Sequence, residues 1–202
     1  MHTESAGWKV SNNSAGPDHG RNTTDYDPNR YDSILTAVGR SWMSGKQPHI
    51  RPGRTTTLAI ETTLPHDPRT VFDFCLNGIN FAATMPDPLE YFWASKLQGE
   101  LGGLYVFDWW YKRVFPIRWA ALVDYYDDGR EFSDIQVRGM FRYFHHTHTC
   151  QPTDDGGTHY RDTIVFRTAL GPWMDRIVVA HEMERVFRVR HERMSRMLRA
   201  GV

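Results

Sequence analysis

The stretch 139–166 constrains the fold of this chain more than any other part of its sequence. Two runs rich in β-branched and aromatic residues, GMFRYFHHTHTC and THYRDTIVF, flank the polar segment QPTDDGG. Runs of this kind around a Gly-containing turn predict an antiparallel hairpin with a loop of about five residues. A loop centred on Asp155 gives a register in which His148 faces Asp162. Opposed side chains lie about 5 Å apart at Cβ, so these two are expected to share a hydrogen bond.

Alternation of side chains along the two strands defines a common face of this hairpin. In the same register His146 opposes Ile164, and Cys150 opposes Tyr160. The common face includes Phe144, His146, His148, Tyr160, Asp162, Ile164 and Phe166. His145 points to the other face, where it is expected at the surface. A slip of one residue would move these groups to opposite faces, so the register decides which side chains meet.

The hairpin also carries a resemblance to a known superfamily. The run GMFRYFHHTHTC, GGTHYRDTIVF, ALGP resembles the START/Bet v 1-like superfamily (SRPBCC, polyketide cyclase/dehydratase and lipid transport) from about residue 56 to the C-terminus. A pattern of G-P-[FY]-x-x-W-x-H-x-H-x-F, then G-G-T-x-[ML]-x-D-x-V-x-Y, then P-x-G is common there. The matching residues are His146, His148, Thr158, Asp162 and Gly171. The residues that depart from it are Met140, Phe144, Cys150 and Ala169. Such a match is specific for the fold and weak for the function, because this fold carries many activities.

The resemblance implies an α+β helix-grip domain over residues 55–202. In this fold a curved antiparallel β-sheet wraps around a long C-terminal helix, and a ligand cavity lies between them. Local patterns agree, since TTTLAIETTL alternates as a first strand, and Asp67-Pro68 is an N-cap followed by proline at the first helical position. A second short helix is predicted at 80–84. Further strands are predicted at 91–98, 104–111, 117–125 and 132–137.

One long helix is predicted from 171 to about 198. Apolar residues there step by three and four and predict a buried stripe. The stripe comprises Ile177, Ala180, Met183, Phe187, Arg190, Met194 and Met197 or Leu198. Seven arginines between Arg176 and Arg199 are interspersed with glutamates, which is typical of a solvated helix face.

Residues 1–54 are predicted to form a disordered tail and linker, because they are polar and contain few aliphatic side chains. The spacing of apolar residues within 29–43 fits a short helix that docks on the domain, and a fraying linker fits equally well. No apolar segment at the N-terminus resembles a signal peptide, and no run is long enough to span a membrane.

Composition narrows the partners of the chain. Lys plus Arg and Asp plus Glu are equal at 24 each, so charge gives no case for binding nucleic acid. The two cysteines, Cys75 and Cys150, form no C-x-x-C pattern, which indicates reduced thiols in a cytoplasmic protein. Aromatic residues make up 13% of the chain and favour an aromatic core or cavity.

The polar groups of the hairpin allow three interpretations. In the first, His146 or His148 acts as acid and base, with Asp162 as the orienting carboxylate, in a cyclase- or dehydratase-type reaction of secondary metabolism. In the second, the His-x-His pair and Asp162 bind a metal ion. The resemblance implies neither a metal nor a cofactor, so we expect none. In the third, His148 and Asp162 satisfy each other and brace the sheet.

On the helix-grip interpretation the ligand is a hydrophobic or aromatic small molecule. Contacts to it are expected from Phe144, Tyr160, Ile164, Phe166, Phe187 and Trp109. Trp109 belongs to a row with Tyr105, Phe107 and Tyr111, and the sequence does not say whether this row or its opposite face is inside. Asp108, on the opposite face, is an alternative acid. The alternative function is a non-catalytic carrier of a lipid or polycyclic ligand.

Overall fold

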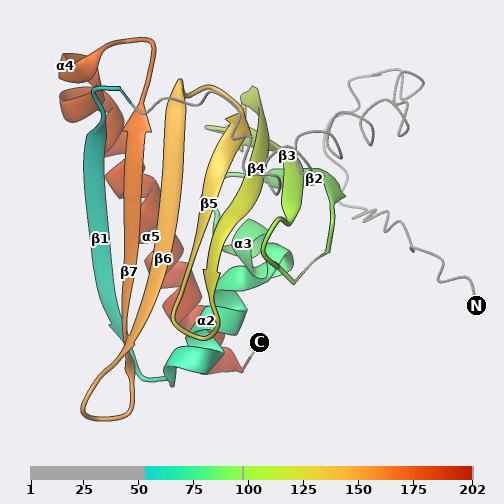
Figure 1. The fold of residues 1–202 in the computed structure, drawn as a ribbon, viewed down its shortest axis with the longest axis vertical. Coiled ribbons are helices and arrows are strands. Elements are labelled where there is room, and N and C mark those ends of the chain that lie inside the picture. The colour runs from blue at the N-terminus through green and yellow to red at the C-terminus, as the bar shows by residue number, and fades with distance from the viewer. Residues whose placement is uncertain (1–52, 97, 202) are drawn as a thin grey trace, which may run out of the picture.

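A computed structural model describes residues 53–96 and 98–201 of the chain (Figure 1). The predicted short helix at 29–43 and nearly all of the predicted tail and linker lie outside these residues. The strands are β1 (Thr56–Leu64), β2 (Leu89–Ala94), β3 (Leu104–Tyr111), β4 (Phe115–Asp127), β5 (Glu131–Arg138), β6 (Tyr143–Pro152) and β7 (Thr158–Arg167). They form one seven-stranded antiparallel sheet in the order β1-β7-β6-β5-β4-β3-β2.

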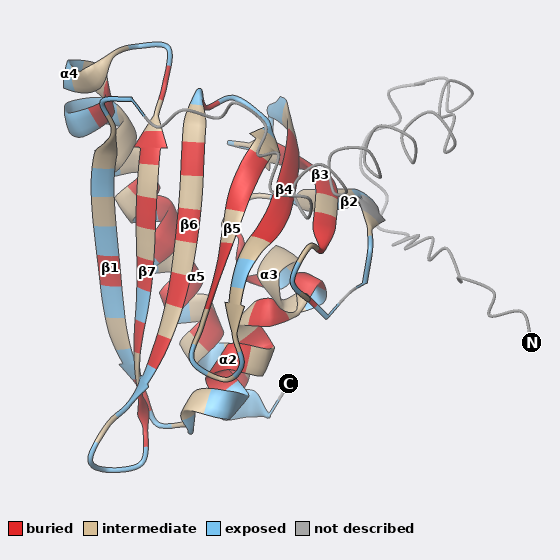
Figure 2. Ribbon diagram, in the orientation of Figure 1, coloured by how far each residue is buried: buried red, intermediate tan, exposed pale blue. Residues whose placement is uncertain are grey.

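The hairpin of β6 and β7 has the predicted register. His148 pairs with Asp162, and the loop between the strands runs from 153 to 157. The polar loop sequence explains this geometry, because Gly156 adopts φ 81°, a left-handed conformation that glycine reaches without a steric penalty. Buried and more exposed residues alternate along both strands, as the strand colouring in Figure 2 shows. One face of the hairpin therefore belongs to the interior.

Two short helices follow β1 and lie close to the C-terminal helix. Helix α2 (Pro68–Leu76) begins as predicted, with the Asp67 side chain accepting a hydrogen bond from the backbone N–H of Thr70. Asn77 ends this helix and also caps α3 (Gly78–Thr84), so that the two helices follow each other directly. Together with the sheet they enclose the lower half of the C-terminal helix (Figure 1).

The C-terminal helix is continuous but not uniform. It comprises α4 (Pro172–Met174), a π-helical turn (Asp175–Val179) and α5 (Ala180–Ala200). The wider π turn changes which side chains face the sheet. Asp175 is therefore fully buried and accepts a hydrogen bond from the backbone N–H of Thr168. Ile177, which the spacing of a regular α-helix placed in the buried stripe, is 53% exposed, so that part of the prediction is wrong.

The main core lies between the sheet and α5. Of the aromatic row on β3, Phe107 and Trp109 belong to this core and face the helix. Val106 belongs to a separate cluster on the opposite face of the sheet, where Asp108 is held by the guanidinium of Arg118 at 2.6 Å. The row that contains Trp109 is thus the inner one, and the alternative acid Asp108 points away from the interior. None of the described helices is long and apolar enough to cross a membrane.

Candidate functional site

A buried carboxylate on β7 is the centre of the candidate site. Asp162 has no solvent-exposed surface. Its Oδ1 atom lies 2.9 Å from Nε2 of His146 and 3.0 Å from Nδ1 of His148, and it accepts a 2.6 Å hydrogen bond from the hydroxyl of Tyr160. Its Oδ2 atom lies 2.9 Å from Nε2 of His191 on α5. One carboxylate therefore joins both strands of the hairpin to the helix.

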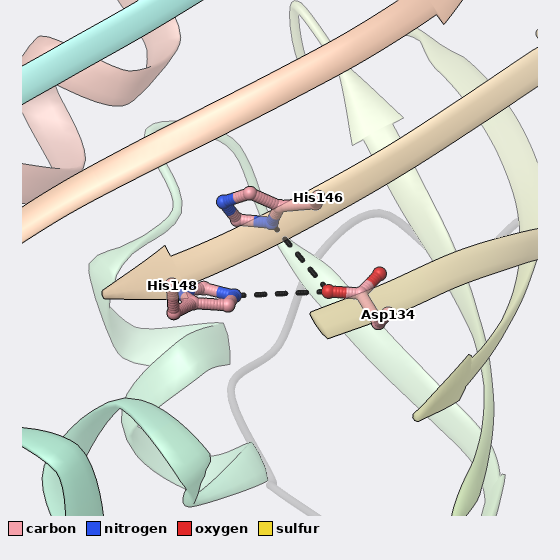
Figure 3. A group of neighbouring side chains, drawn as sticks. All are labelled: Asp134, His146 and His148. Atoms are coloured by element: carbon pink, nitrogen blue, oxygen red, sulfur yellow. Dashed lines mark ion pairs between the residues drawn. The ribbon is translucent and has the colours of Figure 1, made fainter. Parts of the chain in front are cut away.

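A second carboxylate, Asp134 on β5, faces the same two histidines from the other side. Its Oδ2 atom lies 3.5 Å from Nδ1 of His146 and 3.7 Å from Nε2 of His148 (Figure 3). The pairing of β5 with β6 explains this approach, because Asp134 opposes His146 directly. Each imidazole therefore lies between two carboxylates, and only Asp134 keeps part of its side chain exposed, at 21%.

The hydrogen-bond network assigns the protons of this cluster. Tyr160 has one hydroxyl proton, which it donates to Asp162, so Nδ1 of His148 donates to the Tyr160 oxygen at 2.7 Å. Nε2 of His146 donates to Asp162 in the same way. A second proton on His146 would lie on Nδ1 and point towards Asp134. The ring of His148 is fixed from one side by Phe132, which stacks on it at a centroid distance of 4.1 Å.

Burial and neighbouring charges act in opposite directions on the ionisation of the cluster. Burial alone would raise the pKa of Asp134, but hydrogen bonds and charge from His146 and His148 outweigh it and hold that pKa below its usual value. The pKa of Asp162 is likewise held well below its usual range, against burial, by His146 and His148. For His146 burial lowers the pKa, yet the Asp162 charge and hydrogen bonds to both carboxylates raise it overall. The cluster thus favours ionised carboxylates beside an imidazolium.

Other titratable side chains near the site are held in their neutral forms. Burial, reinforced by the Asp162 charge, raises the pKa of Tyr160 well above its usual value. Burial also raises the pKa of the Cys75 thiol to about 12. Because the thiolate is the nucleophilic form, Cys75 is not set up for covalent catalysis. Proton transfer is left to the histidines and Asp134.

A cavity of about 110 Å³, partly open to the surface, lies between the sheet, α3 and α5. Its wall is largely aromatic, and the cluster of Asp134, His146 and His148 forms a polar patch on it. Of the predicted ligand contacts, Phe144, Phe187 and Trp109 line this cavity. Ile164 and Phe166 lie in the packed core beside it, and Tyr160 and Asp162 line a separate pocket of about 10 Å³ behind the histidines.

Among the described residues, the same three polar side chains form a group that could hold a metal ion. Asp134, His146 and His148 each offer one ligand atom, and these atoms lie within 4.8 Å of one another. Two imidazoles and a carboxylate suit zinc or iron, and Asp162 would orient both imidazoles from behind. The carboxylate that could bind a metal together with the two histidines is therefore Asp134. The sequence analysis had considered Asp162 as that ligand.

Two members of the site were not predicted. Asp134 lies in the alternating segment FSDIQV. Its position in the alternation fits the inner face of the sheet, but the sequence does not indicate which side chains it contacts. His191 directly follows Arg190 on the helix, and helical spacing placed only Arg190 in the buried stripe. His145, predicted at the surface, lies on the outer face of the sheet, is 25% exposed at its side chain and pairs with Asp124 at 3.0 Å.

A curved sheet that grips a C-terminal helix around a cavity defines the helix-grip class of fold. Comparison with solved structures agrees and identifies a Bet v 1-like fold. The structure of Ara h 8.0201 matches with a TM-score of 0.57 and 13% identity over 73% of this chain and 99% of that chain. Norcoclaurine synthase from Thalictrum flavum matches with a TM-score of 0.56 and 12% identity over 75% and 92% of the two chains.

A bacterial protein, NE0264 from Nitrosomonas europaea, matches with a TM-score of 0.58 and 12% identity over 72% of this chain and 95% of that one. No family model matches the sequence, and no curated protein matches it either. At these identities the similarity concerns the fold alone, and the function has to be argued from the site.

Proposed function

We propose that the protein binds a small hydrophobic or aromatic molecule in the cavity and acts on it by proton transfer, in a reaction of the cyclase or dehydratase type in secondary metabolism. The observation that carries this proposal is the polar patch of Asp134, His146 and His148 on a largely apolar wall. An apolar cavity with a few convergent polar groups of perturbed pKa is the usual composition of a small-molecule active site.

The chemistry follows from the protonation state of the cluster. The imidazolium of His146 can donate a proton to a carbonyl or a leaving hydroxyl, and Asp162 stabilises its charge from behind. The carboxylate of Asp134 lies beside it on the cavity side, and once His146 has given up its proton the neutral imidazole can act as the base. Reactions that need an acid and a base at one place, such as enolisation, aldol cyclisation and dehydration, fit this histidine. Asp162 is a positioning residue, because it does not line the cavity.

The size of the cavity favours a ligand with a single ring. An apolar cavity of about 150 Å³ admits benzene, so about 110 Å³ suits one ring after small movements of the wall. The neighbour in fold from Thalictrum flavum was solved in complex with dopamine and hydroxybenzaldehyde, which are single-ring molecules. That complex supports the proposal that this fold can hold such ligands.

A carrier without catalytic activity is the second candidate. It is favoured by the way in which the buried polar groups satisfy one another, since His146, His148, Tyr160 and His191 all contact Asp162. Such a network can serve only to brace the hairpin against α5. The two candidates differ in whether the histidines exchange protons with the ligand while it is bound.

Replacement of one histidine separates the two candidates. Native mass spectrometry of protein purified from its own host identifies the ligand that travels with it. With that ligand, His146→Gln keeps a hydrogen-bonding side chain but abolishes titration near neutral pH, so turnover should fall about 10²- to 10⁴-fold with binding retained. His145→Gln on the outer face is the matched control and should leave turnover unchanged. Equal turnover in wild type and His146→Gln would move the chemistry elsewhere, and absence of turnover in wild type would favour the carrier.

A further inference from the structure

A buried arginine lies on the helical wall of the cavity. Arg190, in the middle of α5, is 6% exposed and lines both the main cavity and the smaller pocket. Its guanidinium carbon lies 4.8 Å from the ring centroid of Phe81 and 4.9 Å from that of Phe187. These two aromatic rings hold the guanidinium in place, but they supply no hydrogen-bond acceptor in its plane.

The charge of Arg190 has no counterpart within the described part of the chain. No described carboxylate lies within ion-pair distance of its guanidinium, and its Nε atom has no hydrogen-bond partner. The two carboxylates nearest to the cavity, Asp134 and Asp162, are engaged by histidines. Buried charges are normally paired, because an unpaired one strongly destabilises the folded state. An arginine in this position therefore indicates a partner that comes from outside the described part of the chain.

Two more buried donors on the cavity wall lack a partner among residues 53–96 and 98–201. They are the hydroxyl of Tyr105 and Nε1 of Trp109, both on the inner face of β3. The indole and guanidinium groups only donate hydrogen bonds, and the tyrosine hydroxyl can donate as well. A ligand that satisfies these three groups must therefore carry hydrogen-bond acceptors. The positive charge of Arg190 further requires that one of these acceptors be anionic.

We propose that the ligand of this cavity is a small planar aromatic carboxylate, whose carboxylate group is bound by Arg190. The proposal rests on the function proposed above and specifies its substrate class. The guanidinium presents parallel N–H donors that match the two oxygens of a carboxylate. The aromatic wall and a volume of about 110 Å³ accommodate the ring. Oxygen substituents on the ring would accept from Tyr105 or Trp109.

Three probes of similar shape separate binding of the ring from binding of the charge. Benzoate carries the anion, benzamide is its neutral isostere, and toluene has the ring without an acceptor. Their affinities are measured by isothermal titration calorimetry for the full chain, for Arg190→Met and for Arg188→Met. Arg188 is the matched control, because it lies on the exposed face of the same helix and pairs with Glu184.

The wild type should bind benzoate about ten- to a hundredfold more tightly than benzamide, which is the range for a hydrogen bond to a charged group. This preference should disappear in Arg190→Met, whereas toluene affinity should stay within about threefold, and it should persist in Arg188→Met. Removal of an unpaired buried charge should also leave Arg190→Met at least as resistant to heat as the wild type without ligand.

Each contrary result has a distinct meaning. Equal affinities of benzoate and benzamide in the wild type would overturn the carboxylate proposal, and so would a benzoate preference that survives in Arg190→Met. In either case, binding of toluene would still support the proposal that the cavity binds a hydrophobic ligand. Absence of binding for all three probes would overturn the proposed function and the inference with it. If Arg190→Met fails to fold, Arg190→Lys keeps the charge but loses the paired donors, and an unchanged benzoate preference in that variant would count against the proposal.

Discussion

Replacement of Asp162 by leucine tests whether this carboxylate holds the hairpin and helix together. The change removes the hydrogen-bond partner of Nε2 in both His146 and His191. Tyr160 and His148 keep their 2.7 Å hydrogen bond, with the His148 proton now on Nε2 and the Tyr160 hydroxyl donating to Nδ1, so two donors are left unsatisfied. Each buried unsatisfied donor costs about 1–3 kcal/mol, and the predicted loss of unfolding free energy is therefore about 2–6 kcal/mol. For a chain of this size, about 4 kcal/mol lowers Tm by about 8–16 °C.

The outer face of the sheet offers a matched control for this loss. Glu61 also pairs with a histidine, His159, but its side chain is 46% exposed and that of its partner 37%. Water can replace the lost contact there, so Glu61→Leu should cost no more than about 1 kcal/mol. Urea unfolding followed by circular dichroism measures both variants. A loss below about 1 kcal/mol for Asp162→Leu, or equal losses in the two variants, would refute the assignment of Asp162 as the centre of the network.

Two further predictions concern the protons and the metal-binding capacity of the cluster. The pKa of His146 is raised on folding, so its contribution to stability is complete below the unfolded value of about 6.5 and is lost as the pH rises through the folded value. The difference in Tm between wild type and His146→Gln should therefore shrink above about pH 7, and a difference that grows there would contradict the raised pKa. We also predict that purified protein holds far less than one equivalent of zinc, iron or manganese, because Asp134 and Asp162 already engage both histidines. Elemental analysis that finds about one equivalent, lost in Asp134→Asn but kept in Asp124→Asn, would contradict this.

Local rules were sufficient for the hairpin and for much of the fold. The polar loop around Asp155 and the alternation of the flanking strands predict a register in which Phe144 faces Phe166, and that register is the observed one. Strand β3 was predicted to the residue because LYVFDWWY is bounded by Gly103 and by the Lys112-Arg113 turn. The helix-grip arrangement came from the resemblance, and the structure has the same order of elements.

The remaining part of the site depends on contacts between distant segments. Asp134 meets His146 only because β5 pairs with β6, and no residue of FSDIQV specifies that partner. His191 reaches Asp162 because the curved sheet contacts a wider sector of α5 than one stripe of side chains. The π-helical turn that exposes Ile177 is tied to the buried contact between Asp175 and Thr168, which connects the helix to the end of β7. These features follow from tertiary packing, which periodicity along one segment does not encode.

The most direct test of the account asks whether a ring in the cavity contacts the polar cluster. Phenol is titrated into protein that carries ¹⁵N-labelled histidine, and the imidazole nitrogen resonances are followed by NMR. Saturable shifts are expected for His146 and His148, which line the cavity, and none for His145 on the outer face. Unchanged resonances of His146 and His148 at saturating phenol, or an equal shift of His145, would contradict the placement of the binding site.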